Sequence, residues 1–484
     1  MSEQSLKQKT IRGTAWSMID SVANQGITFL VGLVLARLLT PEEYGLIGII
    51  MIFVAVFNSI VDSGFSNALV RKTDVKDIDY NTVFITNLTL SFVLFFVMFF
   101  CAPWIAQFFH QPQLELLSKV MASIVIINAF AIIQRTILVK KIDFKTQTKI
   151  SLIASLSSGT IGIVMALWGY GVWSLVGQQI SRQLLNTLLL WVYAKWYPRL
   201  QFSKSSFKEL FGFGWKLLAS GLIDTVWREI YQVVIGIFYS PATLGQYSRA
   251  HQFSTIASSN LTAIVQRVSY PVLSSIQGDK ERLKLAYKRV IKVTMLITFV
   301  LMLGMAAVAK PMILVLVGEQ WLPCVPFLQI ICFQMMLYPL NSLNLNMLQV
   351  QGRSDLFLRL EVIKKCVAII PLLLGIYIDI YWMLYGSVVG GFFGYYLNAY
   401  YSGPFINYSI REQIRDIFPS FLIALFMFAC LFCISLLTIN PFILLPMQIV
   451  VGASIVVGIC ELCKQEEYLE IKRITKSYLK INYI

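Results

Sequence analysis

Stretches of about twenty consecutive apolar residues follow one another along most of this chain, and they constrain its fold more than any other feature. A helix of that length crosses the hydrocarbon core of a bilayer. In hydrocarbon every backbone N–H and C=O group must be bonded within the protein, which only helices and closed barrels achieve. The unbroken apolar runs exclude a barrel, because barrel strands alternate apolar and polar residues. The sequence therefore predicts an all-α membrane protein.

The composition agrees with lipid as the main solvent of this chain. Of its 484 residues, 57% are hydrophobic and only 13% are charged, and the mean hydropathy is +0.70. A water-soluble fold of this size does not hide so much apolar surface. No Ala-x-Ala-like cleavage site follows the first apolar stretch, so we expect that no signal peptide is removed.

Counting about twenty residues for each span predicts fourteen transmembrane helices. Basic residues gather at every second connection, whereas the other side keeps only Arg37, Lys119 and Lys310. This asymmetry follows the positive-inside rule and predicts that both termini are cytoplasmic. It also explains the net charge of +15, so we expect no nucleic-acid partner. The predicted spans are residues 14–37, 44–66, 81–109, 118–139, 150–170, 172–194, 211–239, 245–272, 288–318, 322–349, 357–378, 381–402, 414–437 and 441–461.

A short motif recurs 200 residues further along the chain. Pro41 and Gly45 in LTPEEYG correspond to Pro241 and Gly245 in YSPATLG, each at the outer junction of two predicted spans. Such an offset predicts two six-helix lobes in parallel repeat, related by an axis along the membrane normal. The expected parts are residues 1–195 for helices 1–6, 196–402 for helices 7–12, and 403–484 for helices 13–14 and a cytoplasmic tail.

Catalytic and metal-binding motifs are missing from the sequence. It contains no G-x-x-x-x-G-K-[ST] phosphate loop, no H-E-x-x-H, and only two histidines, His110 and His251. Two pairs of cysteines have C-x-x-C spacing, but no further Cys pair or His lies in a polar loop to complete a zinc site. We therefore expect neither a bound metal nor a resident cofactor, and a protein that is not an enzyme.

Polar residues inside two of the spans follow helical spacing. Asp20, Asn24 and Thr28 lie four residues apart in the first span. The seventh span carries Asp224, Arg228 and Gln232 at the same spacing, and the 200-residue offset pairs Asn24 with Asp224 and Thr28 with Arg228. Two polar stripes on related helices predict a water-filled path through the membrane. We expect Asn24, Thr28 and Gln232 to line it.

Charged residues within the spans are the candidate functional groups, because a charge inside a bilayer costs about 2.5–3.5 kcal/mol on insertion scales. Arginine binds phosphate with two parallel hydrogen bonds, so Arg182, Arg228 and Arg249 favour an anionic substrate. The acidic Asp20, Asp224 and Glu229 are candidates for charge balance or for coupling transport to H⁺ or Na⁺.

Two structural alternatives remain open for these charges. Asp224 and Arg228, one turn apart, suit an intrahelical ion pair that only permits insertion. Asp20 and Arg249 lie near span ends, where a side chain that snorkels to the membrane interface explains the charge as well as a functional role does.

Four segments carry a resemblance to a known family: LLTPEEYGLIG (Leu38 to Gly48), VDSGFSNALVRK (Val61 to Lys72), LGQYSRAHQF (Leu244 to Phe253) and PVLSSIQGDKERLKLAYKRV (Pro271 to Val290). Between about residues 10 and 400, the chain resembles bacterial polysaccharide flippases of the multidrug/oligosaccharidyl-lipid/polysaccharide exporter superfamily, in their Wzx-type, teichuronic-acid-exporter-like branch.

The resemblance implies a function for the predicted path. Members are expected to move a lipid-linked oligosaccharide, carried on undecaprenyl pyrophosphate, across the bacterial cytoplasmic membrane by alternating access. The implied partners are this substrate, membrane lipids and other polysaccharide-assembly proteins. A multidrug exporter of the same fold is the first alternative, although its cavity would be acidic or aromatic. A membrane glycan polymerase is the second, and would need a long outer loop with catalytic residues.

Overall fold

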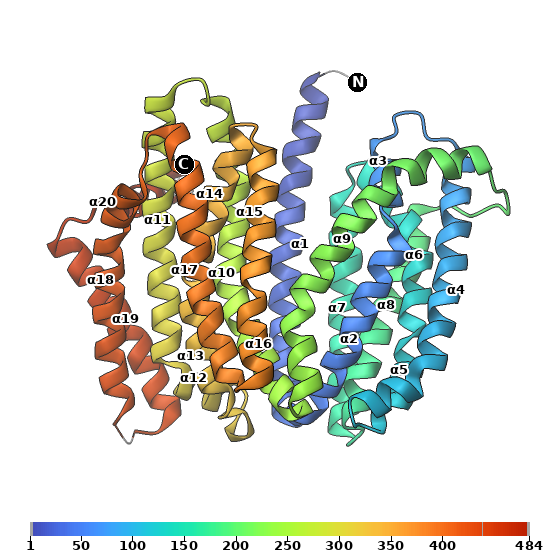
Figure 1. Ribbon diagram of the computed structural model, residues 1–484, viewed down its shortest axis with the longest axis horizontal. Coiled ribbons are helices and arrows are strands. Elements are labelled where there is room, and N and C mark those ends of the chain that lie inside the picture. The colour runs from blue at the N-terminus through green and yellow to red at the C-terminus, as the bar shows by residue number, and fades with distance from the viewer. Residues whose placement is uncertain (1–2, 438, 482–484) are drawn as a thin grey trace. The chain divides into compact units, whose positions relative to one another are not determined.

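The computed structural model describes residues 3–437 and 439–481, and the regular structure in these ranges is entirely helical (Figure 1). The chain divides into two compact units, one ending at Gly245 and the other beginning at Gln246. Within the described residues, nine helical segments are long and apolar enough to cross a membrane. The prediction of an all-α membrane protein is therefore confirmed.

Within its described residues, the first unit contains nine helices and the first residues of a tenth. In this unit α7 packs between α1 and α8, and α6 packs against α8. The helices are α1 (Glu3–Leu38), α2 (Pro41–Asp62), α3 (Phe65–Arg71), α4 (Asp77–Phe108), α5 (Gln113–Met121), α6 (Ser123–Lys140), α7 (Phe144–Leu167), α8 (Val172–Ala194), α9 (Lys204–Phe238) and the start of α10 (Pro241–Ser275).

The second unit continues from α10 to the end of the chain. Here α18 packs against both α11 and α19, and α17 packs against α13, α14 and α16. Its further elements are α11 (Lys280–Ala307), α12 (Ala309–Leu316), η1 (Glu319–Trp321), α13 (Cys324–Met335), α14 (Tyr338–Val350), α15 (Ser354–Val367), α16 (Ile369–Tyr377), α17 (Ile380–Ser402), η2 (Gly403–Ile406), α18 (Ile410–Ser435), α19 (Pro441–Leu462) and α20 (Glu466–Ile481).

Each predicted span coincides with one helix or with two consecutive helices. The predicted span 44–66 is divided because Ser63 and Gly64 have φ angles of 47° and 69°, in the left-handed region that ends α2 and precedes α3. Hydropathy averaged over about twenty residues did not reveal this break, which falls between the apolar run that ends at Val61 and Phe65. The predicted boundaries of the lobes at residues 195 and 402 stay a prediction.

The repeated motif forms the starts of two helices. In α2 the Thr40 hydroxyl accepts a hydrogen bond from the Glu43 amide at 3.4 Å, and the Glu43 carboxylate accepts one from the Thr40 amide at 2.7 Å. This capping box, with Pro41 in the first turn, fixes where the helix begins. In α10 the Ser240 hydroxyl accepts from the Thr243 amide at 3.2 Å. The motif is thus a helix-start signal in both places.

The two helix starts also pack against each other through backbone atoms. A Cβ atom on Gly45 would clash with the carbonyl group of Pro241, and a Cβ atom on Gly245 would clash with the carbonyl group of Pro41. The contact is reciprocal, with each glycine of the motif lying on the proline of the other copy. Only glycine allows this approach, which is the reason the spacing from Pro to Gly is kept in both copies.

Helix α4 exposes a stripe of apolar side chains and buries polar ones, as expected for a helix in lipid. Phe96, Phe100, Trp104 and Phe108 follow one another at four-residue spacing and are all exposed. Several polar side chains of this helix, among them Asn87 and Ser91, are buried inside the unit. The apolar stripe faces outward because hydrocarbon rather than water surrounds it.

Buried polar contacts fix the packing of the second unit. The side chains of Asn344 on α14 and Gln413 on α18 exchange two hydrogen bonds, each 3.2 Å long. The Ser402 hydroxyl of α17 donates to the Asn344 carbonyl oxygen at 2.8 Å. All three residues are fully buried, so this network sets the register of three helices.

We expect Gly45→Ala to destabilise the protein by about 1–3 kcal/mol, because its Cβ cannot be accommodated without moving the backbone of Pro241. The melting temperature of the detergent-purified chain measures this effect. Gly390→Ala in α17 is the control, since a Cβ there meets nothing within 4 Å. Equal melting temperatures for wild type and Gly45→Ala would contradict the proposed close packing.

Candidate functional site

A polar cavity of about 460 Å³ lies within the first unit. Helices α1, α2, α6, α7 and α8 all contribute to its wall. Its polar lining includes amides, hydroxyls, one carboxylate and two guanidinium groups. The lining residues are Asp20, Met51, Val54, Asn58, Ile124, Arg135, Gln147, Ile150, Ser151, Ala154, Ser155, Gln179, Arg182, Gln183, Asn186 and Leu190.

Hydrogen bonds between α1 and α7 form one wall of the cavity. The Ser151 hydroxyl donates to the Asp20 carboxylate, and the Ser155 hydroxyl donates to the side-chain carbonyl of Asn24. Within α1, the Asn24 amide donates to the same carboxylate at 3.1 Å. The four-residue spacing on both helices aligns the two pairs. Asp20 therefore has hydrogen-bond partners within its own unit.

A second chain of hydrogen bonds connects α2, α6 and α8. The Asn128 amide donates to the Asn58 side-chain carbonyl at 3.0 Å, and the Gln183 amide donates to the Asn128 side-chain carbonyl at 3.0 Å. In a membrane each such bond contributes about 0.6 kcal/mol on average. Together with the contacts of α1 and α7, these bonds hold the polar wall in place.

Two arginines give the cavity its positive charge. Arg182 of α8 is half-buried, and Asp20 lies within electrostatic range of it. Arg135 of α6 also lies in the cavity wall, and part of its side chain is exposed at the surface of the unit. Asp62 of α2 acts electrostatically on Arg135 but does not line the cavity. Two guanidinium groups and one carboxylate thus face the same space.

The candidate residues of α9 do not line this cavity. Arg228 donates to the Asp224 carboxylate one turn away, so the predicted ion pair forms. The two side chains nevertheless remain 71% and 53% exposed. The Gln232 amide donates to Glu229 at 2.6 Å. On α1, Thr28 is half-buried and also lies outside the cavity lining.

Arg249 belongs to the second unit and is buried there, with 3% of its surface exposed. Its guanidinium donates to the Gln252 side-chain carbonyl at 2.8 Å and lies 5.1 Å from the ring centroid of Trp321. This cation–π packing keeps the side chain inside the unit, so it does not reach out to the membrane surface.

Sequence reasoning missed Arg135 as a site residue, because it was counted with the basic residues of a cytoplasmic connection. The signal was present, since Arg135 falls inside the predicted span 118–139, between the apolar pairs Ile132–Ile133 and Ile137–Leu138. The neutral Asn58, Gln179, Gln183 and Asn186 were also missed. Single amides in apolar helices give no pattern that separates a cavity wall from ordinary packing.

Comparison with known families decides the relationship. Residues 34–326 match the family described as "Polysaccharide biosynthesis protein", which is more than half of the chain. The chain belongs to this family. The part of the resemblance that concerns polysaccharide biosynthesis is thereby confirmed. The candidate spans described above make the chain a multi-pass membrane protein.

Individual relatives have low sequence identity to this chain but match most of its length. The lipopolysaccharide biosynthesis protein WzxC of Escherichia coli (strain K12) is 24% identical over 373 residues, which are 77% of this chain and 76% of the relative. The teichuronic acid biosynthesis protein TuaB of Bacillus subtilis (strain 168) is 26% identical over 355 residues, 73% of each chain. Among solved structures, the lipid II flippase MurJ in an inward closed conformation has the same fold. Its TM-score is 0.74 at 16% identity, over 94% of this chain and 99% of MurJ.

We expect the double variant Ser151→Ala/Ser155→Ala to lose about 1 kcal/mol of stability, because two hydrogen bonds between α1 and α7 disappear. Thermal unfolding in detergent, combined with hydrogen exchange of α1, checks this loss. Thr160→Ala serves as the control, since that hydroxyl donates to Leu156 of its own helix. If exchange in α1 is unchanged in the double variant, these bonds do not hold the cavity wall.

Proposed function

We propose that this protein carries a lipid-linked oligosaccharide across the bacterial cytoplasmic membrane, by alternating access, for surface polysaccharide biosynthesis. The observation that carries the proposal is a polar cavity, lined by two arginines, inside a unit that exposes large apolar side chains. Membership of the polysaccharide biosynthesis family supports the saccharide, and the MurJ-like fold supports movement between leaflets. Substrate binding would favour one conformation of the protein, and substrate release on the other side of the membrane would favour the other conformation.

The anionic part of the substrate would be a pyrophosphate, carried on undecaprenyl. Arg135 and Arg182 lie in one cavity and each offers a planar fork of N–H donors that matches phosphate oxygens. In a space shielded by hydrocarbon such contacts are stronger than in bulk water. A cationic drug would be repelled by the same pair, and for this reason we favour the flippase over the multidrug exporter.

The proposal includes fourteen membrane crossings. Beyond the nine segments that meet the criteria of length and hydropathy, α8, α9, α10, the pair α15 and α16, and α17 coincide with predicted spans. In α8 and α9 the hydropathy is lowered by polar residues that a transport path requires, such as Arg182 and Arg228, whereas α15 and α16 are each too short to span a membrane alone. Both termini would be cytoplasmic, with two six-helix lobes followed by two C-terminal helices.

The acidic residues are proposed to couple transport to H⁺ or Na⁺. Asp20 is the strongest candidate, because its carboxylate accepts hydrogen bonds from Ser151 and Asn24 while Arg182 lies within electrostatic range. Protonation or cation binding would weaken its attraction for Arg182 and free that arginine for substrate. Asp224 and Glu229 are further candidates on α9. If neither an imposed H⁺ gradient nor an imposed Na⁺ gradient changes the transport rate of the wild-type protein, these residues do not couple transport to either ion.

The protein is proposed to be a transporter without catalytic activity, working beside other polysaccharide-assembly proteins that make and consume its substrate. Co-purification of a glycosyltransferase or a polymerase with the full chain would test that association. Glycan elongation by the purified chain alone would instead support the polymerase alternative.

Arg135→Gln and Arg182→Gln should each reduce substrate translocation at least tenfold, because removing one partner of a charged contact costs roughly 2–5 kcal/mol. Proteoliposomes containing a fluorescent undecaprenyl-pyrophosphate oligosaccharide and an impermeant glycosidase outside measure the rate. Arg199→Gln is the control, since Arg199 is exposed in the connection before α9. Full activity of both variants would refute the cavity assignment, and uptake of cationic dyes without oligosaccharide exposure would favour the drug exporter.

Arg228 gives a separate test, because its ion pair with Asp224 suits either transport or insertion. Both side chains are largely exposed near the middle of the 35-residue α9, where contact with lipid would be costly, so we propose that they face the aqueous path. Arg228→Gln should therefore lower translocation, and Asp224→Asn in addition should not restore it. Recovery in the double variant would show that the pair serves insertion only.

A further inference from the structure

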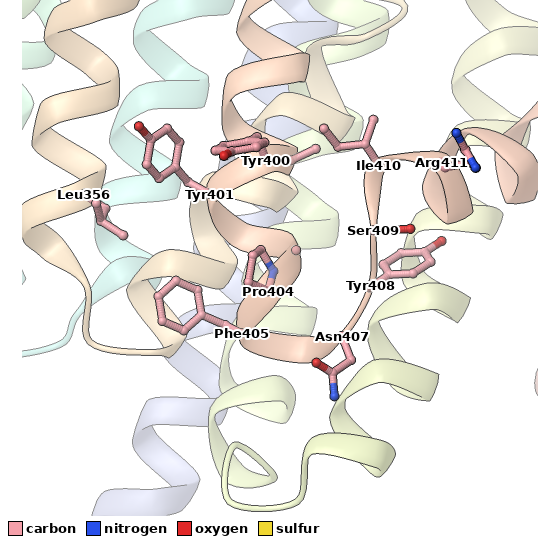
Figure 2. Close-up of a pocket in the computed structure, with 12 residues that line it drawn as sticks. Leu356, Tyr400, Tyr401, Pro404, Phe405, Asn407, Tyr408, Ser409, Ile410 and Arg411 are labelled. Carbon is pink, nitrogen blue, oxygen red and sulfur yellow. The ribbon is translucent and has the colours of Figure 1, made fainter.

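A second cavity, of about 820 Å³, lies in the second unit at the junction of α17, η2 and α18. Figure 2 shows Tyr400, Tyr401 and Phe405 on the side of α17 and η2, and Arg411 in the first turn of α18. Leu356 of α15 also contributes to the wall. The lining is mostly apolar, in contrast to the polar cavity of the first unit, so a different kind of ligand fits it.

Two arginines near this cavity have no acidic partner. Within the part of the chain that the structure describes, neither Arg411 nor Arg415 forms an ion pair, although both are exposed and lie one turn apart on α18. The acidic residues between and beside them face the other way. Glu412 pairs with Lys284 at 3.0 Å, and Asp416 pairs with Lys288 at 3.0 Å, both on α11. The first two turns of α18 therefore present two uncompensated positive charges.

The apolar lining continues along both helices away from these charges. On α17, Tyr396 and Tyr400 are stacked with ring centroids 6.1 Å apart, and both are more than half exposed. On α18, Ile414 and Phe418 follow at four-residue spacing and are 46% and 50% exposed. A ligand at this site thus meets positive charge at one end and an apolar surface that extends into the bilayer at the other.

We propose that this junction is a binding site for an anionic glycerophospholipid of the membrane. The phosphate would lie at Arg411 and Arg415, and the acyl chains would lie against Tyr400, Tyr401 and Phe405 and then along α17 and α18. An amphipathic anion is the ligand that contacts both parts of this site. A soluble phosphate would leave the apolar surface without a partner, and a neutral lipid would leave the two arginines without one. The lipid is a resident ligand of the second unit, separate from the proposed cargo.

Native mass spectrometry of the full chain in detergent tests the proposal. The probes are phosphatidylglycerol and phosphatidylcholine with identical acyl chains. Wild type should retain phosphatidylglycerol in preference, and Arg411→Gln/Arg415→Gln should reduce that preference roughly 30-fold, since each basic residue near an anionic lipid contributes about fivefold in affinity. Lys204→Gln/Lys208→Gln is the matched control, because it removes two exposed charges at the same spacing from the start of α9.

A second variant tests the apolar part of the site. Phe405→Ala should lower the retention of phosphatidylglycerol while leaving the preference for its headgroup unchanged. Equal retention of the two lipids by wild type would overturn the proposal, as would an unchanged preference in the double arginine variant. Because the readout is binding of a lipid that carries no saccharide, the result does not depend on the flippase proposal.

Discussion

The first unit depends on how polar side chains inside a membrane satisfy one another. Hydrocarbon offers no hydrogen-bond partners, so each carboxylate or amide in a span must find one within the protein or in a water-filled space. Ser151 and Ser155 supply partners for Asp20 and Asn24, and Asn128 connects Asn58 with Gln183. Because these bonds join α1 to α7 and α2 to α6 and α8, they hold together the helices whose side chains line the cavity.

Charge in this unit is arranged in two different ways. Around the cavity, Asp20 and Arg182 interact without a direct ion pair, so each keeps donor or acceptor capacity for another group. On α9, Asp224 and Arg228 are joined directly and remain exposed. The first arrangement suits exchange of a partner, because no strong contact has to break before an anion binds. In the second, an anion has to compete with a carboxylate already in place.

Apolar runs of about twenty residues predicted the helices well because burial in lipid acts on every residue of a span. The predicted span 172–194 coincides with α8, and Arg182 was recognised because a charge far from both helix ends has few structural explanations. The cavity wall was harder to predict. Arg135 was assigned to a connection by its neighbours in sequence, and Asn58 and Gln183 become neighbours only through Asn128, once three helices have packed. Tertiary contacts of this kind leave no periodic signal.

The reciprocal packing of Gly45 on Pro241 and of Gly245 on Pro41 has a consequence for conformational entropy. Glycine and proline lose no rotamer freedom when they are buried. The contact between the starts of α2 and α10 therefore forms without the side-chain ordering that accompanies packing by leucine or methionine. The crossing point of the two helices is thus set by backbone contact, and no side-chain rotamer of the four contacting residues has to be fixed to form it.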